Sequence, residues 1–200
     1  MDNHKRIYRI YREEKLQVRH RRKRRGKHLR GAPLAFPQGP NQVWGLDFVS
    51  DQLANGRRIR ILCIVDLYSR ECLALEADTS ISGDRVSRVL QRLIETRGKP
   101  QALLSDNGPE FVCKAMQLWA NDAGIVLNQI EPGKPSQNGF VESFNGKFRD
   151  DCLNENWFAS LEEVRQIIEN WRVEYNAVRP HSSLGYQTPE EFAANWQKAA

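Results

Sequence analysis

Long apolar runs are absent from this 200-residue sequence, and with them the usual signature of a membrane-spanning protein. No stretch approaches the roughly 18 consecutive apolar residues of a transmembrane helix. The N-terminal segment lacks the apolar core of a secretory signal, so we expect a cytoplasmic protein. The four cysteines form no Cys-x-x-Cys pair. In a cytoplasmic chain we expect them to be buried apolar residues rather than a disulfide framework.

The overall composition is that of an ordinary folded domain, with 40% apolar and 28% charged residues. These values exclude a disordered or collagen-like chain and predict one domain, with room for an appendage. Charge is distributed unevenly along the chain. Residues 1–30 hold 13 Lys and Arg against 3 Asp and Glu, whereas the rest holds 17 against 22. A basic arm is therefore attached to a mildly acidic body.

The arm has the composition of a nucleic-acid-binding segment. Its densest part, HRRKRRGKHLR, can neutralise several phosphates at once and would bind by releasing counterions. The cations expected to contact phosphate are Arg21, Arg22, Lys23, Arg24 and Arg25. The alternative is a solvated basic tail. Apolar residues at near-helical spacing in KRIYRIYREEKLQ predict an amphipathic helix within the arm. We assign residues 1–31 to the arm, 32–41 to a turn-rich linker and 42–195 to a core domain.

The core has the pattern of a mixed α/β fold. Three strands, joined by short connections, are expected to form an antiparallel meander. Helices and strands then alternate, which predicts a mixed five-stranded sheet with helices packed on its faces. The expected strands cover 42–51, 59–68, 70–77, 101–105 and 125–130, and the expected helices cover 82–97, 110–123, 140–151 and 161–175. Ser82 is the expected cap of the first of these helices.

Three acidic residues occupy positions suited to chemistry. Asp47 lies in the first strand, with its side chain on the same face as Gly45 and Val49. Asp106 ends the fourth strand, where open α/β sheets place their ligands. Thirty-five residues separate Asp106 from Glu142, which lies in a helix entered through a Gly- and Pro-rich loop. Carboxylates suit Mg²⁺ or Mn²⁺, and two such ions can activate an attacking oxygen and stabilise a leaving one.

Other residues of similar type are given structural roles. Asp51 and Asp66 are expected to be structural or surface acids, with Arg60 or Arg70 as a partner for Asp66. His181 has no second ligand at metal spacing, so zinc is not expected. We favour a packing role for the Pro-bounded turn around it, with DNA contact by Arg179, His181 and Tyr186 as the alternative.

Several strings together carry a family resemblance. WGLDFVSD, SDNGPEF, KPSQNGFVESFNGKFRDDCLN and EYNAVRPHSSLGYQTPEEF resemble the catalytic core of bacterial insertion-sequence transposases, over about residues 40–195. The most similar group is the one whose B reading frame encodes the core, and retroviral integrases are more distant relatives. The resemblance implies a ribonuclease-H-like fold with a helical basic arm. It also implies that Asp47, Asp106 and Glu142 form the family's acidic triad.

The resemblance further implies DNA strand cleavage and strand transfer by a homo-oligomer, with Mg²⁺ or Mn²⁺ as cofactor, two ions in all, and no small-molecule cofactor. Arg149 matches a basic residue of the family, and Lys147, Asn145 and Lys134 are further candidates for DNA contact. Family members usually carry a helix-turn-helix region ahead of the core, and only its last stretch matches here. Two alternatives therefore stay open. One is a non-catalytic DNA-binding product that regulates the full transposase, and the other is a nuclease acting on RNA–DNA hybrids.

Overall fold

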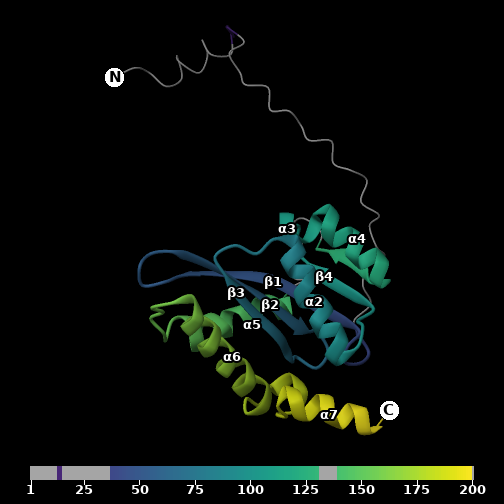
Figure 1. The fold of residues 1–200 in the computed structure, drawn as a ribbon. Helices are drawn as coiled ribbons and strands as arrows, with labels where there is room; N and C mark the ends of the chain where they lie inside the picture. The colour runs from purple at the N-terminus through teal and green to yellow at the C-terminus, as the bar shows by residue number, and fades with distance from the viewer. Residues whose placement is uncertain (1–12, 15–36, 131–138, 200) are drawn as a thin grey trace.

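The sheet is the centre of the fold in the computed structural model, which describes residues 13–14, 37–130 and 139–199 (Figure 1). Its five strands follow the order β3-β2-β1-β4-β5. The first three strands form the predicted antiparallel meander, and β4 and β5 are added parallel to β1. The strands are β1 (Val43–Gln52), β2 (Arg58–Asp66), β3 (Cys72–Asp78), β4 (Ala102–Ser105) and β5 (Val126–Gln129). The prediction of a mixed five-stranded sheet flanked by helices is confirmed.

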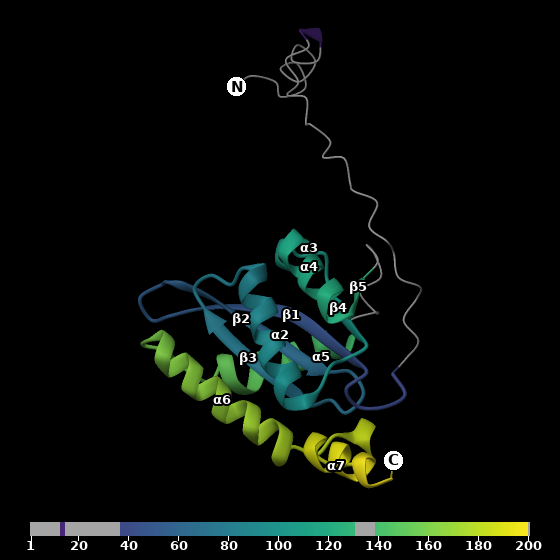
Figure 2. The same ribbon diagram turned by 45° about the vertical axis from the view of Figure 1, so that its right-hand side comes forward.

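Helices cover both faces of this sheet, because side chains alternate between the faces along each strand. One apolar core joins the sheet to α2 (Gly83–Arg97), α3 (Pro109–Val112) and α4 (Lys114–Ala123). A second core lies on the opposite face and joins it to α5 (Gly139–Phe148), η2 (Arg149–Leu153) and α6 (Leu161–Ala177). Figure 2 shows α6 leading through η3 (Ser182–Leu184) to α7 (Pro189–Ala199) at the C-terminal end.

Local sequence signals explain where most helices begin and end. Ser82 caps α2 as predicted, accepting a hydrogen bond from the Arg85 backbone N–H. Ser160 caps α6 in the same way, accepting from the Glu163 N–H, and the Glu163 side chain accepts from the backbone N–H of Ala159. Gly124 ends α4 in the left-handed conformation that favours glycine.

The structure corrects three of the predicted elements. The helix expected over 110–123 is two helices, α3 and α4, which meet at an extended Cys113. The helix expected over 140–151 changes at Arg149 into the π-helical η2. The C-terminal helix α7 was missed, although Thr188 and Glu191 form a capping box ahead of it. Its aromatic residues Phe192 and Trp196 contact Tyr68.

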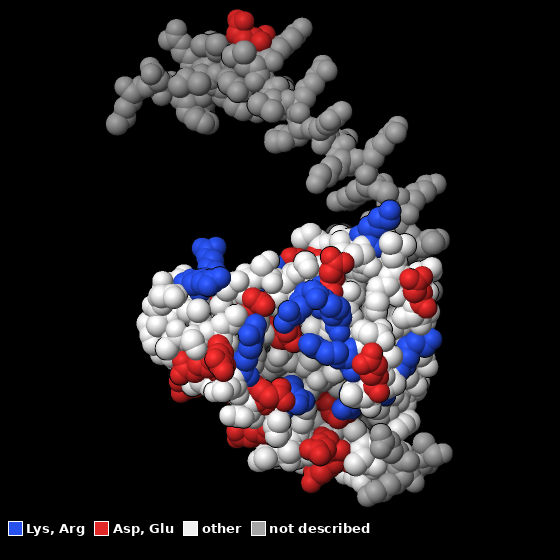
Figure 3. Space-filling view, in the orientation of Figure 1, with Lys and Arg blue, Asp and Glu red and all other residues white. Residues whose placement is uncertain are grey.

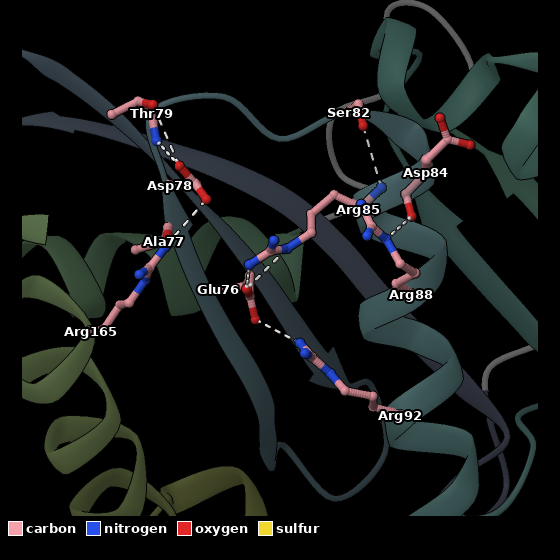
Figure 4. Close-up of polar contacts among 10 residues, drawn as sticks. All are labelled: Glu76, Ala77, Asp78, Thr79, Ser82, Asp84, Arg85, Arg88, Arg92 and Arg165. Carbon is pink, nitrogen blue, oxygen red and sulfur yellow. Dashed lines mark hydrogen bonds and ion pairs between the residues drawn. The ribbon is translucent and has the colours of Figure 1, made fainter. Parts of the chain in front are cut away.

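Charged side chains attach α2 and α6 to the edge strand β3 (Figure 4). Glu76 accepts hydrogen bonds from Arg85 and Arg92 of α2, the second at 2.9 Å. Arg165 of α6 donates to the Ala77 carbonyl at 3.1 Å and pairs with Asp78. Figure 3 accordingly shows basic and acidic side chains interspersed on this face, rather than one continuous basic field. These contacts also occupy part of the open edge of β3, which would otherwise be free to pair with another strand.

Asp66, at the end of β2, holds the linker residue Asn41 against the core. Asp66 is 1% exposed and accepts from the backbone N–H groups of Asn41, Tyr68 and Ser69. The structural role expected for Asp66 is confirmed, but the partners are backbone groups, and Arg60 pairs with Glu110 instead.

Within the described ranges, no helix has the length and apolar character needed to cross a bilayer.

Replacing Asp66 by Ala is expected to destabilise the fold strongly. Three backbone N–H groups would be left without their acceptor, which costs about 3 kcal/mol of unfolding free energy at roughly 1 kcal/mol each. The matched control is Asp51→Ala, since Asp51 is only partly buried and accepts from its neighbour Gln52. We expect that control to stay within about 0.5 kcal/mol of the parent chain in urea unfolding. Equal effects of the two substitutions would contradict the role assigned to Asp66.

Candidate active site

Asp47 lies on the face of β1 that α5 covers. Its Oδ1 accepts a hydrogen bond from the Phe48 N–H, and its Oδ2 accepts one from Asn145 Nδ2, both at 2.8 Å. The next residue on the same face, Val49, belongs to the apolar core that contains Phe144 of α5. The predicted sharing of one face by Gly45, Asp47 and Val49 therefore agrees with the packing. The carboxylate is anchored at both oxygens before any ligand arrives.

Asp106 is placed beside Asp47 by the parallel register of two strands. Leu46 of β1 is the partner of Ser105 of β4, so the residue after each lies at the same edge position on neighbouring strands. Asp106 then leaves the strand in a tight turn, where its Oδ1 accepts from the Gly108 N–H at 2.9 Å. A side chain at position 108 would bring its Cβ to 2.9 Å from that same oxygen. Glycine therefore lets the turn close around the carboxylate.

Glu142 is brought to this edge because α5 approaches β1 very closely. A Cβ added to Gly45 would lie 2.4 Å from Cγ2 of Val141 and 2.8 Å from Cδ2 of Leu67, so only glycine fits there. One turn further along α5, Asn145 meets Asp47, two residues further along β1. The helix and the strand thus run alongside each other in matched steps of about 6 Å. Glu142 follows Val141 and is exposed.

The three carboxylates influence one another electrostatically. Burial raises the pKa of Asp47 above its ordinary value, and the charges of Asp106 and Glu142 raise it further. The hydrogen bonds from Phe48 and Asn145 oppose this rise but do not cancel it. Among the described residues, none of the three forms a salt bridge. The site therefore holds uncompensated negative charge, which a cation would relieve.

The donor chemistry of this site fits a hard divalent cation, but the carboxylates have not converged on a common point. Three carboxylate side chains without a cationic partner are the ligands that Mg²⁺ and Mn²⁺ use. In the part of the chain that the structure describes, no group of three His, Cys, Asp or Glu side chains is close enough together to hold an ion.

Cys63 lies directly across from Asp47 on β2. Burial raises the pKa of the Cys63 thiol, so this thiol stays neutral.

The candidate residues for DNA contact differ in their exposure and in their partners. Asn145 was expected to contact DNA, but it is partly buried and donates to Asp47. Lys147 is exposed on α5. Arg149 is exposed at the start of η2, and its guanidinium lies 3.5 Å from the Ser50 carbonyl along β1. The remaining candidates lie outside the described residues: Lys134, Arg21, Arg22, Lys23, Arg24 and Arg25.

One contact near the site was missed from the sequence. Arg70 adopts a left-handed φ of 65° in the turn between β2 and β3, and its guanidinium carbon lies 3.4 Å from the Phe140 ring centroid. Phe140 belongs to the first turn of α5, two residues before Glu142. The turn thus contacts the start of the helix that carries Glu142. A contact between residues 70 positions apart leaves no local sequence signal.

Comparison with known proteins supports the predicted family by sequence and the predicted architecture by fold. Models described as integrase core domain match residues 37–135 and 123–189. The chain is 50% identical to a 31.7 kDa insertion element IS407 protein of Burkholderia multivorans, covering 99% of this chain and 72% of that protein. It is 49% identical to a 39.2 kDa insertion element IS476 protein of Xanthomonas euvesicatoria, covering 98% and 56%.

Among solved structures, the HTLV-2 integrase catalytic core domain in complex with magnesium matches with a TM-score of 0.57 and 21% identity. The match covers 78% of this chain and 98% of that chain. At this identity the likeness concerns the fold, and it confirms the predicted ribonuclease-H-like architecture.

Adding a side chain at Gly45 is expected to displace the helix that carries Glu142. Gly45→Ala should lower the free energy of unfolding by about 1–3 kcal/mol, because the new methyl group overlaps Val141 and Leu67. Gly146→Ala is the matched control, since nothing lies within 4 Å of its added Cβ. Within a helix that change should stabilise, by up to about 1 kcal/mol. A Gly45→Ala chain as stable as the parent in urea unfolding would contradict the close approach.

Proposed function

Because the chain belongs to the insertion-sequence transposases with an integrase core domain, we propose that this core catalyses metal-dependent cleavage and strand transfer of DNA. The observation that carries the proposal is the grouping of Asp47, Asp106 and Glu142. Asp47 lies in β1, Asp106 directly follows the neighbouring strand β4, and the charges of Asp106 and of Glu142 in α5 both act on Asp47. The reaction class needs positioned negative ligands rather than a nucleophilic side chain, since water or a DNA 3′-hydroxyl is the attacking group.

Asp47, Asp106 and Glu142 would hold two divalent ions, either Mg²⁺ or Mn²⁺. When bound, such ions make an attacking oxygen more nucleophilic and stabilise the charge on the leaving oxygen. The chain's own contribution is to fix the ligands. Asn145 and the Phe48 N–H orient the Asp47 carboxylate, and the Gly108 N–H orients that of Asp106. The mutual repulsion of the three carboxylates favours the uptake of cations.

DNA contacts are assigned by exposure and charge. Arg149 is exposed, with its guanidinium near the Ser50 carbonyl, three residues along β1 from Asp47, and would hold a phosphate next to the reacting one. Lys147 and Lys134 are further cationic candidates, and Arg21, Arg22, Lys23, Arg24 and Arg25 would bind phosphates without regard to sequence. Asn145, which donates to Asp47, remains a candidate for DNA contact. We also propose that the chain acts as a homo-oligomer on DNA, as strand transfer requires two DNA ends to be held together.

A second candidate function is a DNA-binding product without catalytic activity, which competes with the full transposase. One observation favours it: within the described residues the carboxylates do not converge into a group able to hold an ion. The two candidates differ in a measurable way, since both bind DNA and only the first cuts it.

Nicking of labelled duplex DNA in the presence of Mn²⁺ tests the proposed catalysis. Glu142→Gln should reduce the rate by at least about a hundredfold, since removing a ligand forfeits several kcal/mol of charge stabilisation. Glu162→Gln, at an exposed acid in the first turn of α6, is the matched control and should cut at the parent rate. Equal rates for both variants would exclude Glu142 from the site. Retained binding without cleavage by any of these proteins would support the second candidate.

Replacing Arg21, Arg22, Lys23, Arg24 and Arg25 of the arm by Gln should weaken the salt dependence of DNA binding. Each cation that no longer neutralises a phosphate lowers the slope of log affinity against log salt by about 0.9 on duplex DNA. Fluorescence anisotropy at several salt concentrations measures the slope. The control is the double variant Arg88→Gln, Arg92→Gln, because both side chains are exposed on α2 amid acidic neighbours. An unchanged slope in the arm variant would contradict phosphate binding by the arm.

A further inference from the structure

Tyr186 is exposed and conformationally strained. Its side chain is 78% exposed, so it takes little part in the core. Its backbone adopts a left-handed φ of 64°, which bulky L-residues rarely occupy. Gly185 before it is also left-handed, but glycine adopts that conformation without penalty. Strain of this kind persists only where the surrounding structure enforces it, and it concentrates at sites that act on a ligand.

The loop around Tyr186 is held rigidly. The His181 N–H donates to the Gln187 carbonyl at 2.9 Å, which closes the two ends of the loop. The N–H groups of Leu184 and Tyr186 both donate to the His181 carbonyl, at 3.0 and 2.8 Å. Leu184 is buried and anchors the middle of the loop. Residues 181–187, which we call the Tyr186 loop, therefore keep the tyrosine in its strained, outward position.

The Tyr186 loop is connected to the helix of the candidate active site. The buried ring of His181 makes an edge contact with Tyr175 of α6, at a centroid distance of 5.1 Å. Tyr175 makes a second edge contact, also at 5.1 Å, with Phe144 of α5. Phe144 is two residues from Glu142 on the same helix. The expected packing role of this segment thus holds for His181, whereas Tyr186 is left to face outward.

Cations lie near the buried end of the loop, and the exposed acids Glu190 and Glu191 follow the loop in the first turn of α7. The charged groups that act on His181 are all cations, namely Lys147 of α5, Arg179 and Arg70. Together with burial, which is the largest cause, they lower the pKa of His181 to about 4. Arg179 is paired with Asp151, and Glu191 at the start of α7 accepts from the Thr188 N–H. Lys147 is exposed on α5, and its charge acts on His181.

We propose that the Tyr186 loop is a DNA contact surface, in which Tyr186 stacks on an unpaired base while Lys147 contacts the neighbouring phosphate. The proposal rests on the proposed function, since it adds a second contact to the same DNA. Aromatic side chains stack on bases of any sequence, and adjacent cations follow the backbone. A strained, outward aromatic ring, in a loop whose buried His181 is acted on by the charge of Lys147, suits this partner.

Photochemical cross-linking locates the contact directly. The full chain is bound to duplex DNA with a single-stranded overhang that carries 5-iodouracil, irradiated, and the linked residue is mapped by mass spectrometry. We expect linkage at Tyr186. Trp157 is the internal control, since it is an equally exposed aromatic residue, at 80%, beside the acidic Glu155 rather than a cation. Linkage at Trp157 or in residues 1–30, without linkage at Tyr186, would overturn the proposal.

Substitution separates DNA contact from a structural role. Asn tolerates the left-handed conformation, so Tyr186→Asn should leave the melting temperature unchanged or raise it. The same variant should bind overhang DNA about fivefold more weakly or worse, with an unchanged salt dependence, because the stacking interaction that it removes is uncharged. Tyr186→Trp should retain affinity, and Trp157→Ala should bind like the parent. Lys147→Gln should lower the salt slope by about 0.7 on single strands.

A tyrosine that served packing alone would give the opposite pattern, with a lower melting temperature and unchanged affinity. The two proposals also fail separately. If the parent chain nicks DNA and depends on Glu142, yet Tyr186→Asn binds the overhang as tightly as the parent, only the Tyr186 loop is excluded. If the parent chain neither binds nor cuts DNA, both the proposed function and the contact surface are excluded.

Discussion

The close approach of α5 to β1 at Gly45 is the constraint on which the candidate active site depends. Without a side chain at Gly45, Val141 sits directly on the strand, between Leu67 and the apolar end of β4. That contact sets how far Asn145 stands from Asp47 and where Glu142 enters the site. The turn between β2 and β3 adds to it, since Arg70 lies over Phe140 in the first turn of the helix. A single methyl group at position 45 would act on all of these contacts together.

Charge is organised differently inside and outside this site. Elsewhere in the described chain, acids that anchor elements have partners: Glu76 binds two arginines, Glu110 pairs with Arg60, and Asp66 accepts three backbone bonds. The pKa of Glu110 is lowered by its arginine, as expected for an acid with a partner. The pKa of Asp47 is instead raised by burial and by two neighbouring acids. Among the described residues, Asp47, Asp106 and Glu142 form no salt bridge, so they leave negative charge that a cation would relieve.

The sequence predicted the sheet and most helices because their signals are local. Alternation identified the strands, Ser82 marked the start of α2, and Gly124 marked the end of α4. The prediction failed where contacts between distant segments decide the outcome. The break between α3 and α4 falls at Cys113, whose sulfur fills the space beside Gly83 of α2. The change to η2 after Phe148 follows packing of α5 against α6 and also left no periodic signal. The start of α7 was marked by a capping box, and there the signal was present in the sequence but not used.

The roles of individual residues likewise depend partly on local sequence and partly on contacts between distant segments. The amino-acid sequence is enough to select the candidate acids, because strand ends, a tight Asn-Gly-Pro turn and a spacing of 35 residues are properties of the chain alone. That Asp47 and Asp106 are neighbours follows from the folded sheet, since strands 59 positions apart pair by a register that no local pattern specifies. Folding likewise assigns Asn145 to Asp47, and gives His181 and Tyr186 of one short loop opposite environments. Those outcomes depend on which surfaces meet when the helices pack on the sheet, and side-chain chemistry alone leaves that choice open.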